Sequence, residues 1–141
     1  MNTFVMRLLD LIIAFIGIIV SLPILVVITI IGYFDTGSPV FTQVRVGKNK
    51  KSFILIKFRT MGVDTVSVAS HLASPASITH IGRFLRKTKL DELPQLVNVI
   101  KGDMRFIGPR PEVPEFVTED SFSFLSTIKP GLSGYSSILF R

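Results

Sequence analysis

Two adjacent carboxylates, Asp91 and Glu92, stand in a part of the sequence that is otherwise rich in cations. The cations around them are Arg83, Arg86, Lys87, Lys89 and Arg110. A carboxylate beside several cations can attack or hold a phosphate, because the cations offset the charge on the phosphoryl oxygens. One carboxylate could hold Mg²⁺, which prefers carboxylate oxygens and bridges to substrate phosphates, while the other attacks phosphorus.

A helix is predicted to begin at this pair, with Asp91 as its N-cap. Pro94 is tolerated in the first turn and Gly102 ends the helix. The apolar residues at helical spacing are Leu93, Leu96, Val97 and Ile100. The amide donors at the start of such a helix favour a phosphate. The alternative is structural: Asp91 only caps the helix, Glu92 is a first-turn acid and the arginines are solvated.

Two strands are predicted upstream, over residues 40–44 and 52–58, because both segments are rich in β-branched and aromatic residues. The loop 47–51 between them makes the pair a hairpin. Lys57 and Arg59 lie at the end of the second, apolar strand, and are therefore better placed than the other cations to point into a site. The loop cations are expected to form a solvated face: Lys48, Lys50 and Lys51.

Three further segments have weaker patterns. Residues 78–90 are predicted to form a short helix with its cations on one side. Residues 62–77 are rich in Ser, Ala and Val, which indicates a mobile loop or a poor helix. Two prolines flank Arg110 and restrict its backbone, and the glycine-rich turn 129–134 leads into a short, strand-like C-terminus.

Residues 11–34 contain no charged side chain, and a helix is predicted over residues 4–34. This length spans a hydrocarbon core, which needs about 20 residues. It exceeds the apolar region of a signal peptide, about 7–15 residues, so the segment is expected to be retained. Pro23 interrupts the helix, and Ser21 could hydrogen-bond a freed carbonyl. Hydropathy alone favours a kinked single-pass span. The other topology is a broken helix that enters and leaves by the same face.

Composition narrows the classes of partner. The net charge of +6 suits a lipid headgroup, a phosphorylated substrate or nucleic acid. Nucleic acid is not expected, because the 12 Phe mostly lie in apolar runs instead of between cations. The chain has no Cys, which excludes disulfides and thiolate metal sites, and His71 and His80 lack metal-ligand spacing. It also has no P-loop, dinucleotide-binding, zinc or nucleophile-elbow motif.

In the blocks around these residues the chain resembles the bacterial sugar transferase family, the monotopic phosphoglycosyl transferases or undecaprenyl-phosphate sugar phosphotransferases. The resemblance runs from Met6 to about Tyr135. Its blocks are residues 7–11, 37–41, 43–47, 57–61, 81–86, 90–95, 102–104, 108–112 and 130–134. The family usually continues further past the last block, so the chain, which ends at Arg141, is expected to lack the family's C-terminal region.

The resemblance implies transfer of a sugar 1-phosphate from a UDP-sugar to polyprenyl (undecaprenyl) phosphate, with Mg²⁺ and release of UMP. This step would initiate exopolysaccharide or glycoconjugate synthesis through an aspartyl-phosphosugar intermediate. By the family's motif, Asp91 is the nucleophile and Glu92 the metal ligand. The residues that fall where phosphate or nucleotide contacts are expected are Lys57, Arg59, Arg86 and Arg110. An alternative of another class is a catalytically inactive, membrane-associated fragment or binding module.

The resemblance also implies an α+β fold in two parts: a re-entrant membrane helix over residues 1–34, and a small, mixed helical domain with a short β-hairpin over residues 35–141. The helix would be broken at its proline, in contrast to the single-pass span that hydropathy favours. The second part would lie on the cytoplasmic face of the bacterial inner membrane, in contact with membrane lipid. A homo-oligomer is one option for its assembly.

Overall fold

The computed structural model describes residues 3–65, 77–117 and 127–133. Its order of elements is α1 (Thr3–Thr36), β1 (Val40–Val46), β2 (Ser52–Phe58), α2 (His80–Thr88), α3 (Gln95–Lys101), β3 (Arg105–Ile107) and β4 (Gly131–Ser133). Short 3₁₀ turns are η1 (Lys48–Lys50), η3 (Leu90–Glu92) and η4 (Pro114–Phe116). This mixture of helices and two small sheets confirms the predicted α+β class.

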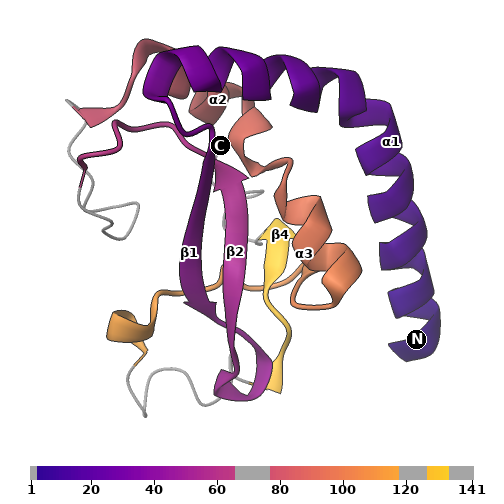
Figure 1. Cartoon of the computed structure of the whole chain (residues 1–141). Coiled ribbons are helices and arrows are strands. Elements are labelled where there is room, and N and C mark those ends of the chain that lie inside the picture. Colours follow the sequence, from indigo (N-terminus) through magenta and orange to yellow (C-terminus); the bar gives the residue numbers. More distant parts are fainter. Residues whose placement is uncertain (1–2, 66–76, 118–126, 134–141) are drawn as a thin grey trace.

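The long apolar helix α1 confirms the helix predicted over residues 4–34. It changes direction part-way along its length and arches over the rest of the molecule (Figure 1). Pro23 lies inside α1 and explains the bend, because it leaves the Ile19 carbonyl without its helical donor. The Ser21 hydroxyl donates instead to the neighbouring Ile18 carbonyl, at 3.4 Å. By length and composition α1 is able to cross a membrane, and only 17% of its most apolar window is buried.

The predicted hairpin is confirmed. Strands β1 and β2 pair antiparallel from Val40 opposite Phe58 to Val46 opposite Ser52. Asn49 and Lys50 both have positive φ, 58° and 59°, as the two central residues of a type I′ turn require. This turn matches the twist of the strands and so fixes their register.

Asn98, which is fully buried, joins α3 to the outer edge of β2. Its side-chain amide donates to the Ile54 carbonyl at 2.7 Å, and its side-chain oxygen accepts from the Ile56 amide at 3.1 Å. The strand edge is therefore paired by a side chain instead of a third strand. This contact places the end of β2 beside the segment that precedes α3.

Two apolar clusters pack the two halves of α1 onto the rest of the chain. Ala14 packs with residues of β2 and α3 and with Met104, just before β3, in one cluster, and Ile28 packs with Phe58 and Leu85 in the other. Figure 1 shows the same arrangement, with α3 beside the N-terminal half of α1 and α2 beneath its C-terminal half. The bend thus lets one helix cover two sides of the small domain.

Polar contacts hold both ends of α1. Near its start, Arg7 donates to the Val99 and Ile100 carbonyls at 2.6 and 2.7 Å, and Asp10 pairs with Arg105 at 2.9 Å. At its end, Asp35 accepts from the Thr79 hydroxyl at 2.7 Å. Both polar ends of the apolar helix therefore contact the same small domain.

The predicted helix start at the carboxylate pair is wrong. Asp91 lies inside the 3₁₀ turn η3, whose N-cap position is Lys89, and α3 begins only at Gln95 with Pro94 before it. Proline lacks an amide hydrogen and is favoured just before or at a helix start, so the helix forms after it. The predicted end at Gly102 is confirmed, with φ of 90°.

The predictions for the remaining segments agree with the structure in part. The helix expected over residues 78–90 is α2, with Thr79 as its N-cap. The weakly patterned segment 62–77 lies mostly outside the described residues. Part of the turn predicted at residues 129–134 is instead strand β4, which pairs parallel to β3, and the strand-like C-terminus predicted after that turn lies outside the described residues.

Candidate functional site

Asp91 occupies a buried position between two helices, with 7% of its surface exposed. Lys89 ends α2 in the left-handed conformation, φ 62°, and turns the chain directly into η3. The Glu92 amide donates back to the Lys89 carbonyl at 3.2 Å, which closes the turn. The carboxylate pair is thus held by a tight turn and by the helices on either side of it.

Desolvation is the largest cause of the raised pKa of Asp91. Burial raises its pKa first and the adjacent Glu92 raises it further, while Lys57, Lys89 and Arg86 act against both. Its Oδ1 atom is buried and accepts no hydrogen bond from the described part of the chain. A buried oxygen atom without a partner is costly in a folded protein and is expected where a ligand or metal binds.

Lys57 is brought to Asp91 from the end of β2. Burial, opposed by Asp91 and assisted by neighbouring arginines, lowers its pKa to about 8. Its ammonium lies 5.3 Å from the centre of the Phe41 ring, which is its cross-strand partner in the hairpin. Lys57 and Asp91 are therefore close enough to act on each other's pKa, and a contact of Lys57 with substrate stays a prediction.

Arg86 reaches the site from α2. Its Nε donates to the hydroxyl of the buried Thr60 at 2.9 Å. One turn earlier in α2 stands Gly82, where a Cβ atom would collide with the Thr60 backbone. The absent side chain allows α2 to pack directly on the segment after β2, and this close approach positions Arg86.

Arg110 reaches Glu92 from the loop that follows β3. Its Nη1 lies 3.5 Å from Glu92 Oε1, and 56% of its side chain is exposed. The loop that carries Arg110 is anchored to β1, because the Arg45 guanidinium donates to the Pro111 carbonyl at 3.0 Å and the Val46 amide donates to the Glu112 carbonyl at 2.9 Å. Arg110 is therefore a charge on a fixed loop at an open edge of the site.

Arg59 differs from the other predicted site cations. Its Nε donates to the Ser38 carbonyl at 2.9 Å and its guanidinium lies 5.4 Å from the Phe41 ring centre. The structure thus gives Arg59 a role in joining the end of β2 to the segment before β1. Its expected contact with substrate stays a prediction.

Arg45 is a site residue that the sequence interpretation missed. It is 4% exposed, its Nη2 donates to Gln43 at 2.6 Å, and its Nε has no partner in the described part of the chain. Burial lowers the pKa of Arg45. One signal was available: in β1 Arg45 alternates in phase with Phe41, on the face that also carries Lys57.

The comparisons with known proteins define the class of protein. The model of the family described as bacterial sugar transferase matches residues 1–141. The chain therefore belongs to this family, as its motifs predicted.

Its relatives include named phosphotransferases. A Bacillus subtilis protein, provisionally named an undecaprenyl-phosphate N-acetylgalactosaminyl 1-phosphate transferase, is 45% identical over 78% of this chain and 63% of its own length. A UDP-N-acetylgalactosamine-undecaprenyl-phosphate N-acetylgalactosaminephosphotransferase of Aeromonas hydrophila is 33% identical over 96% of this chain and 34% of its own. An undecaprenyl-phosphate galactose phosphotransferase of Salmonella typhimurium is 33% identical over 94% of this chain and 32% of its own length. The chain thus spans less than two thirds of the length of these relatives.

Proposed function

We propose that this chain forms the catalytic core of a phosphoglycosyl transferase, which moves a sugar 1-phosphate from a UDP-sugar to undecaprenyl or another polyprenyl phosphate and releases UMP. The observation that supports this most directly is Asp91, a buried carboxylate with an unpartnered oxygen and cations that act on its pKa. The names of the relatives support both substrate classes. Such a transfer would start the synthesis of an exopolysaccharide or glycoconjugate.

The proposed reaction has two steps at one phosphorus atom. In the first, a carboxylate oxygen of Asp91 attacks the phosphorus that bears the sugar, and the bond to the UMP oxygen breaks. In the second, a phosphate oxygen of polyprenyl phosphate attacks the same phosphorus, and the bond to Asp91 breaks. The carboxylate is regenerated, so no other reactant is consumed.

The cations have complementary roles in both steps. Lys57 and Arg86 act on the pKa of Asp91 from two sides and would offset charge on the transferring phosphoryl group. With a pKa of about 8, Lys57 is mostly protonated at neutral pH. Arg110, which is half-exposed beside Glu92, is suited to hold the departing nucleotide phosphate.

Mg²⁺ fits the donors at this site. Asp91 Oδ1 has no partner in the described part of the chain, and Glu92 supplies a second carboxylate beside it. Mg²⁺ commonly takes one or two protein carboxylates and completes its shell with water and substrate phosphates. We assign Glu92 as its ligand. When bound, the ion would neutralise phosphate charge as a Lewis acid.

The proposal includes a re-entrant topology for α1. Arg7 and Asp10 at its start, and Asp35 at its end, all contact the same small domain. A helix that crossed a bilayer would place these two ends about 30 Å apart on opposite sides of the hydrocarbon core. The bend at Pro23 is consistent with both ends on the cytoplasmic face of the inner membrane, and it argues against the single-pass span.

Cysteine labelling tests this topology. Cysteines introduced as Asn2→Cys and Lys50→Cys should both react with a membrane-impermeant maleimide only after the inside of the cell is exposed. The chain has no native cysteine, so each signal belongs to the introduced residue. Labelling of the two positions from opposite sides of the membrane would establish a single-pass span and refute the re-entrant helix.

Transfer activity is tested with membranes that carry this chain, undecaprenyl phosphate, Mg²⁺ and either UDP-N-acetylgalactosamine or UDP-galactose. UMP release is expected with at least one donor, and Asp91→Asn should abolish it. Asp64→Asn is the matched control, because Asp64 is an exposed acid in a turn outside the site. If the wild-type chain released no UMP with any UDP-sugar, the inactive fragment or binding module would be the better description.

A further inference from the structure

A polar pocket, away from Asp91, lies at the far end of the hairpin, where the type I′ turn faces the C-terminal end of α3. Its volume is about 320 Å³. Lys57 stands five residues along β2 from Ser52, so the two sites are separated by about 17 Å of strand. We call this site the lysine pocket; it is lined by Gly47, Lys48, Asn49, Lys51, Ser52, Phe53, Lys101, Gly102, Asp103 and Lys129.

The lysine pocket carries a large excess of positive charge. Four lysines line it, against Asp103 as its single acid. Asp103 is already engaged, because its carboxylate accepts from Asn98 at 3.2 Å and pairs with Lys101 at 3.6 Å. Lys48 and Lys51 form no ion pair with the described residues. The charge that these two lysines bring is therefore left uncompensated by the described part of the protein.

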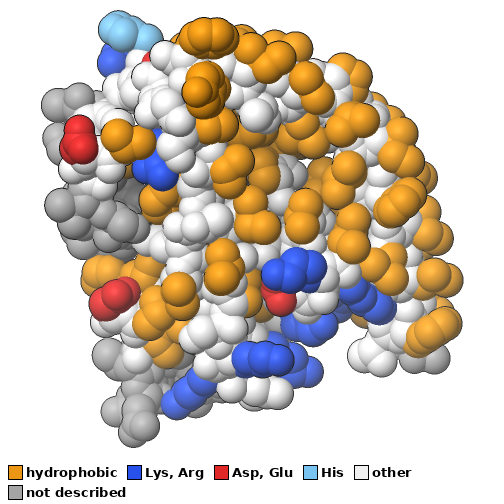
Figure 2. Space-filling model, in the orientation of Figure 1, with side chains coloured by type: hydrophobic (Ala, Val, Ile, Leu, Met, Phe, Trp, Pro, Cys, Tyr) orange, Lys and Arg blue, Asp and Glu red, His pale blue; other side chains and the backbone are white. Residues whose placement is uncertain are grey.

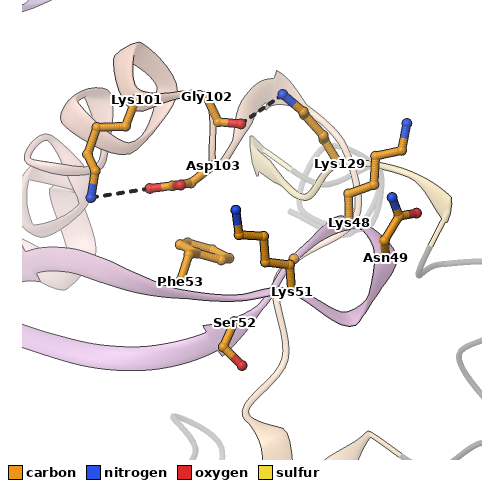
Figure 3. A pocket seen from close by; sticks show the side chains of 10 residues that line it. Lys48, Asn49, Lys51, Ser52, Phe53, Lys101, Gly102, Asp103 and Lys129 are labelled. Atoms are coloured by element: carbon orange, nitrogen blue, oxygen red, sulfur yellow. Dashed lines mark hydrogen bonds and ion pairs between the residues drawn. The ribbon is translucent and has the colours of Figure 1, made fainter.

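The lysines reach the pocket from three segments: the hairpin turn, the C-terminal end of α3 and the residues before β4. Figure 3 shows Lys51 extending from the hairpin toward Phe53 and Asp103, and Lys48 extending from the same hairpin on the side of Lys129. Lys129 is fixed there by its 2.8 Å hydrogen bond to the Gly102 carbonyl. Burial lowers the pKa of Lys129, and the nearby cations Arg7 and Lys48 lower it further. An anion at this position would relieve that mutual repulsion.

The backbone holds this arrangement in place. Asn49 in the hairpin turn and Gly102 at the end of α3 both have positive φ, so both sides of the pocket end in tight turns. A Cβ atom at Gly102 would lie 3.3 Å from Arg7 Nη2 and 3.8 Å from Lys129 Nζ. The pocket therefore also adjoins the start of α1.

We propose that the lysine pocket binds a phosphate-bearing anion, either the headgroup phosphate of an acidic membrane lipid or a free phosphate, at a site separate from Asp91. Several lysines around one small pocket suit a phosphate, which accepts charge-assisted hydrogen bonds in several directions. A lipid source would be consistent with Arg7, which adjoins the pocket just before the apolar part of α1. Figure 2 shows Lys and Arg gathered at the lower end of the molecule, below the hydrophobic surface of α1.

Lys50 provides a matched control within the same turn. It carries the same charge as Lys48 and Lys51 and is also exposed, yet it does not line the pocket. The double variant Lys48→Gln/Lys51→Gln removes the uncompensated charge, whereas Lys50→Gln removes charge only beside the pocket. All three side chains are solvent-exposed, so both variants should fold, and far-ultraviolet circular dichroism verifies this.

Two measurements on the full chain distinguish the sources of the phosphate. In an uncharged detergent, inorganic phosphate is titrated into the protein by calorimetry. In nanodiscs, the thermal midpoint in phosphatidylcholine alone is compared with that in phosphatidylcholine plus phosphatidylglycerol. Binding in the first measurement identifies a free-phosphate site, and a raised midpoint only with phosphatidylglycerol identifies a lipid headgroup site. Neither readout requires transfer activity, so failure of the proposed reaction would leave the result intact.

The expected result is a signal in at least one measurement. In Lys48→Gln/Lys51→Gln that signal should disappear or weaken by at least about ten-fold in affinity, because charge-assisted contacts are lost. Lys50→Gln should remain close to the wild type. The proposal is overturned if the wild type gives no signal in either measurement. It is also overturned if Lys50→Gln weakens binding as much as the double variant, since net charge alone would then explain it.

Discussion

Asp10 and Arg105 form an ion pair, with Oδ2 and Nε 2.9 Å apart, that joins the first turns of α1 to the start of β3. The side chains are only 11% and 26% exposed, respectively. A partly buried pair that loses one member leaves the other charge without a partner. The contact is thus one of the bonds that hold the apolar helix against the small domain.

Asp10→Asn is expected to lower the free energy of unfolding by about 1–3 kcal/mol, because Arg105 then lacks its charged acceptor. The double variant Asp10→Asn/Arg105→Gln should be no less stable than the single one, since no unpaired charge remains. Thermal unfolding in detergent measures both variants. Strictly additive losses in the double variant would mean that the two residues do not interact.

Asn98→Ala is expected to cost about 2–4 kcal/mol, because it removes two hydrogen bonds to β2 and leaves a cavity in a fully buried position. Val97→Ala is the control on the same helix, since Val97 is 39% exposed, and it should change stability by less than about 1 kcal/mol. Chemical denaturation measures both variants. Equal losses would show that α3 is not held to β2 through Asn98.

The lowered pKa of Lys57 predicts that the pH–rate profile of the proposed transfer falls on its alkaline side. The free enzyme loses the Lys57 charge as the pH passes about 8, so kcat/KM for the UDP-sugar should fall above that pH. Lys57→Arg should move this fall to higher pH, because a guanidinium stays protonated. An unchanged fall in Lys57→Arg would assign it to another group.

The same shift has a consequence for stability. The pKa of Lys57 is about 8 in the folded protein and 10.5 is its ordinary value, so between these limits the unfolded chain binds more protons. Stability should therefore rise with pH through this window, and the rise should shrink in Lys57→Gln. Thermal midpoints of the wild type and Lys57→Gln, measured between pH 7 and pH 10.5, test whether stability rises with pH as expected.

Asp91→Asn is expected to raise the thermal midpoint while it abolishes transfer. Burial and Glu92 raise the pKa of Asp91, which means that its charged form is disfavoured in the folded state. Above its folded pKa the ionised carboxylate therefore destabilises the protein, and a neutral amide of the same shape removes that cost. Glu112→Gln, in the neighbouring loop, serves as a comparison. A lower midpoint for Asp91→Asn would show that the charge is well compensated by the cations.

Local patterns predicted much of the secondary structure. The hairpin, the end of α3 at Gly102 and the apolar helix over residues 4–34 were all predicted, because each depends on turn chemistry or on periodicity within a short segment. The start of α3 was misplaced, since Asp91 has the side chain of an N-cap but occupies a 3₁₀ turn in which Lys89 precedes it.

Local sequence patterns did not show which of the hairpin cations lie near Asp91, because strand pairing decides this. Arg45 and Lys57 belong to one basic run, yet the pairing of β1 with β2 brings both close to the site while the turn directs Lys48 and Lys51 into a different pocket. The three turn lysines were predicted to share a solvated face, and all three are exposed, but Lys48 and Lys51 also line that pocket.

By itself the sequence determined the family, the carboxylate pair and the cations expected around it, because these are properties of residue order within short blocks. Only the tertiary structure decided that Lys57 lies within electrostatic reach of Asp91, that Arg59 instead joins Ser38 and that both ends of α1 contact one domain. The physical reason is that burial and charge pairing depend on which distant segments the apolar core brings together, and that choice is made by packing and not by neighbours in the chain.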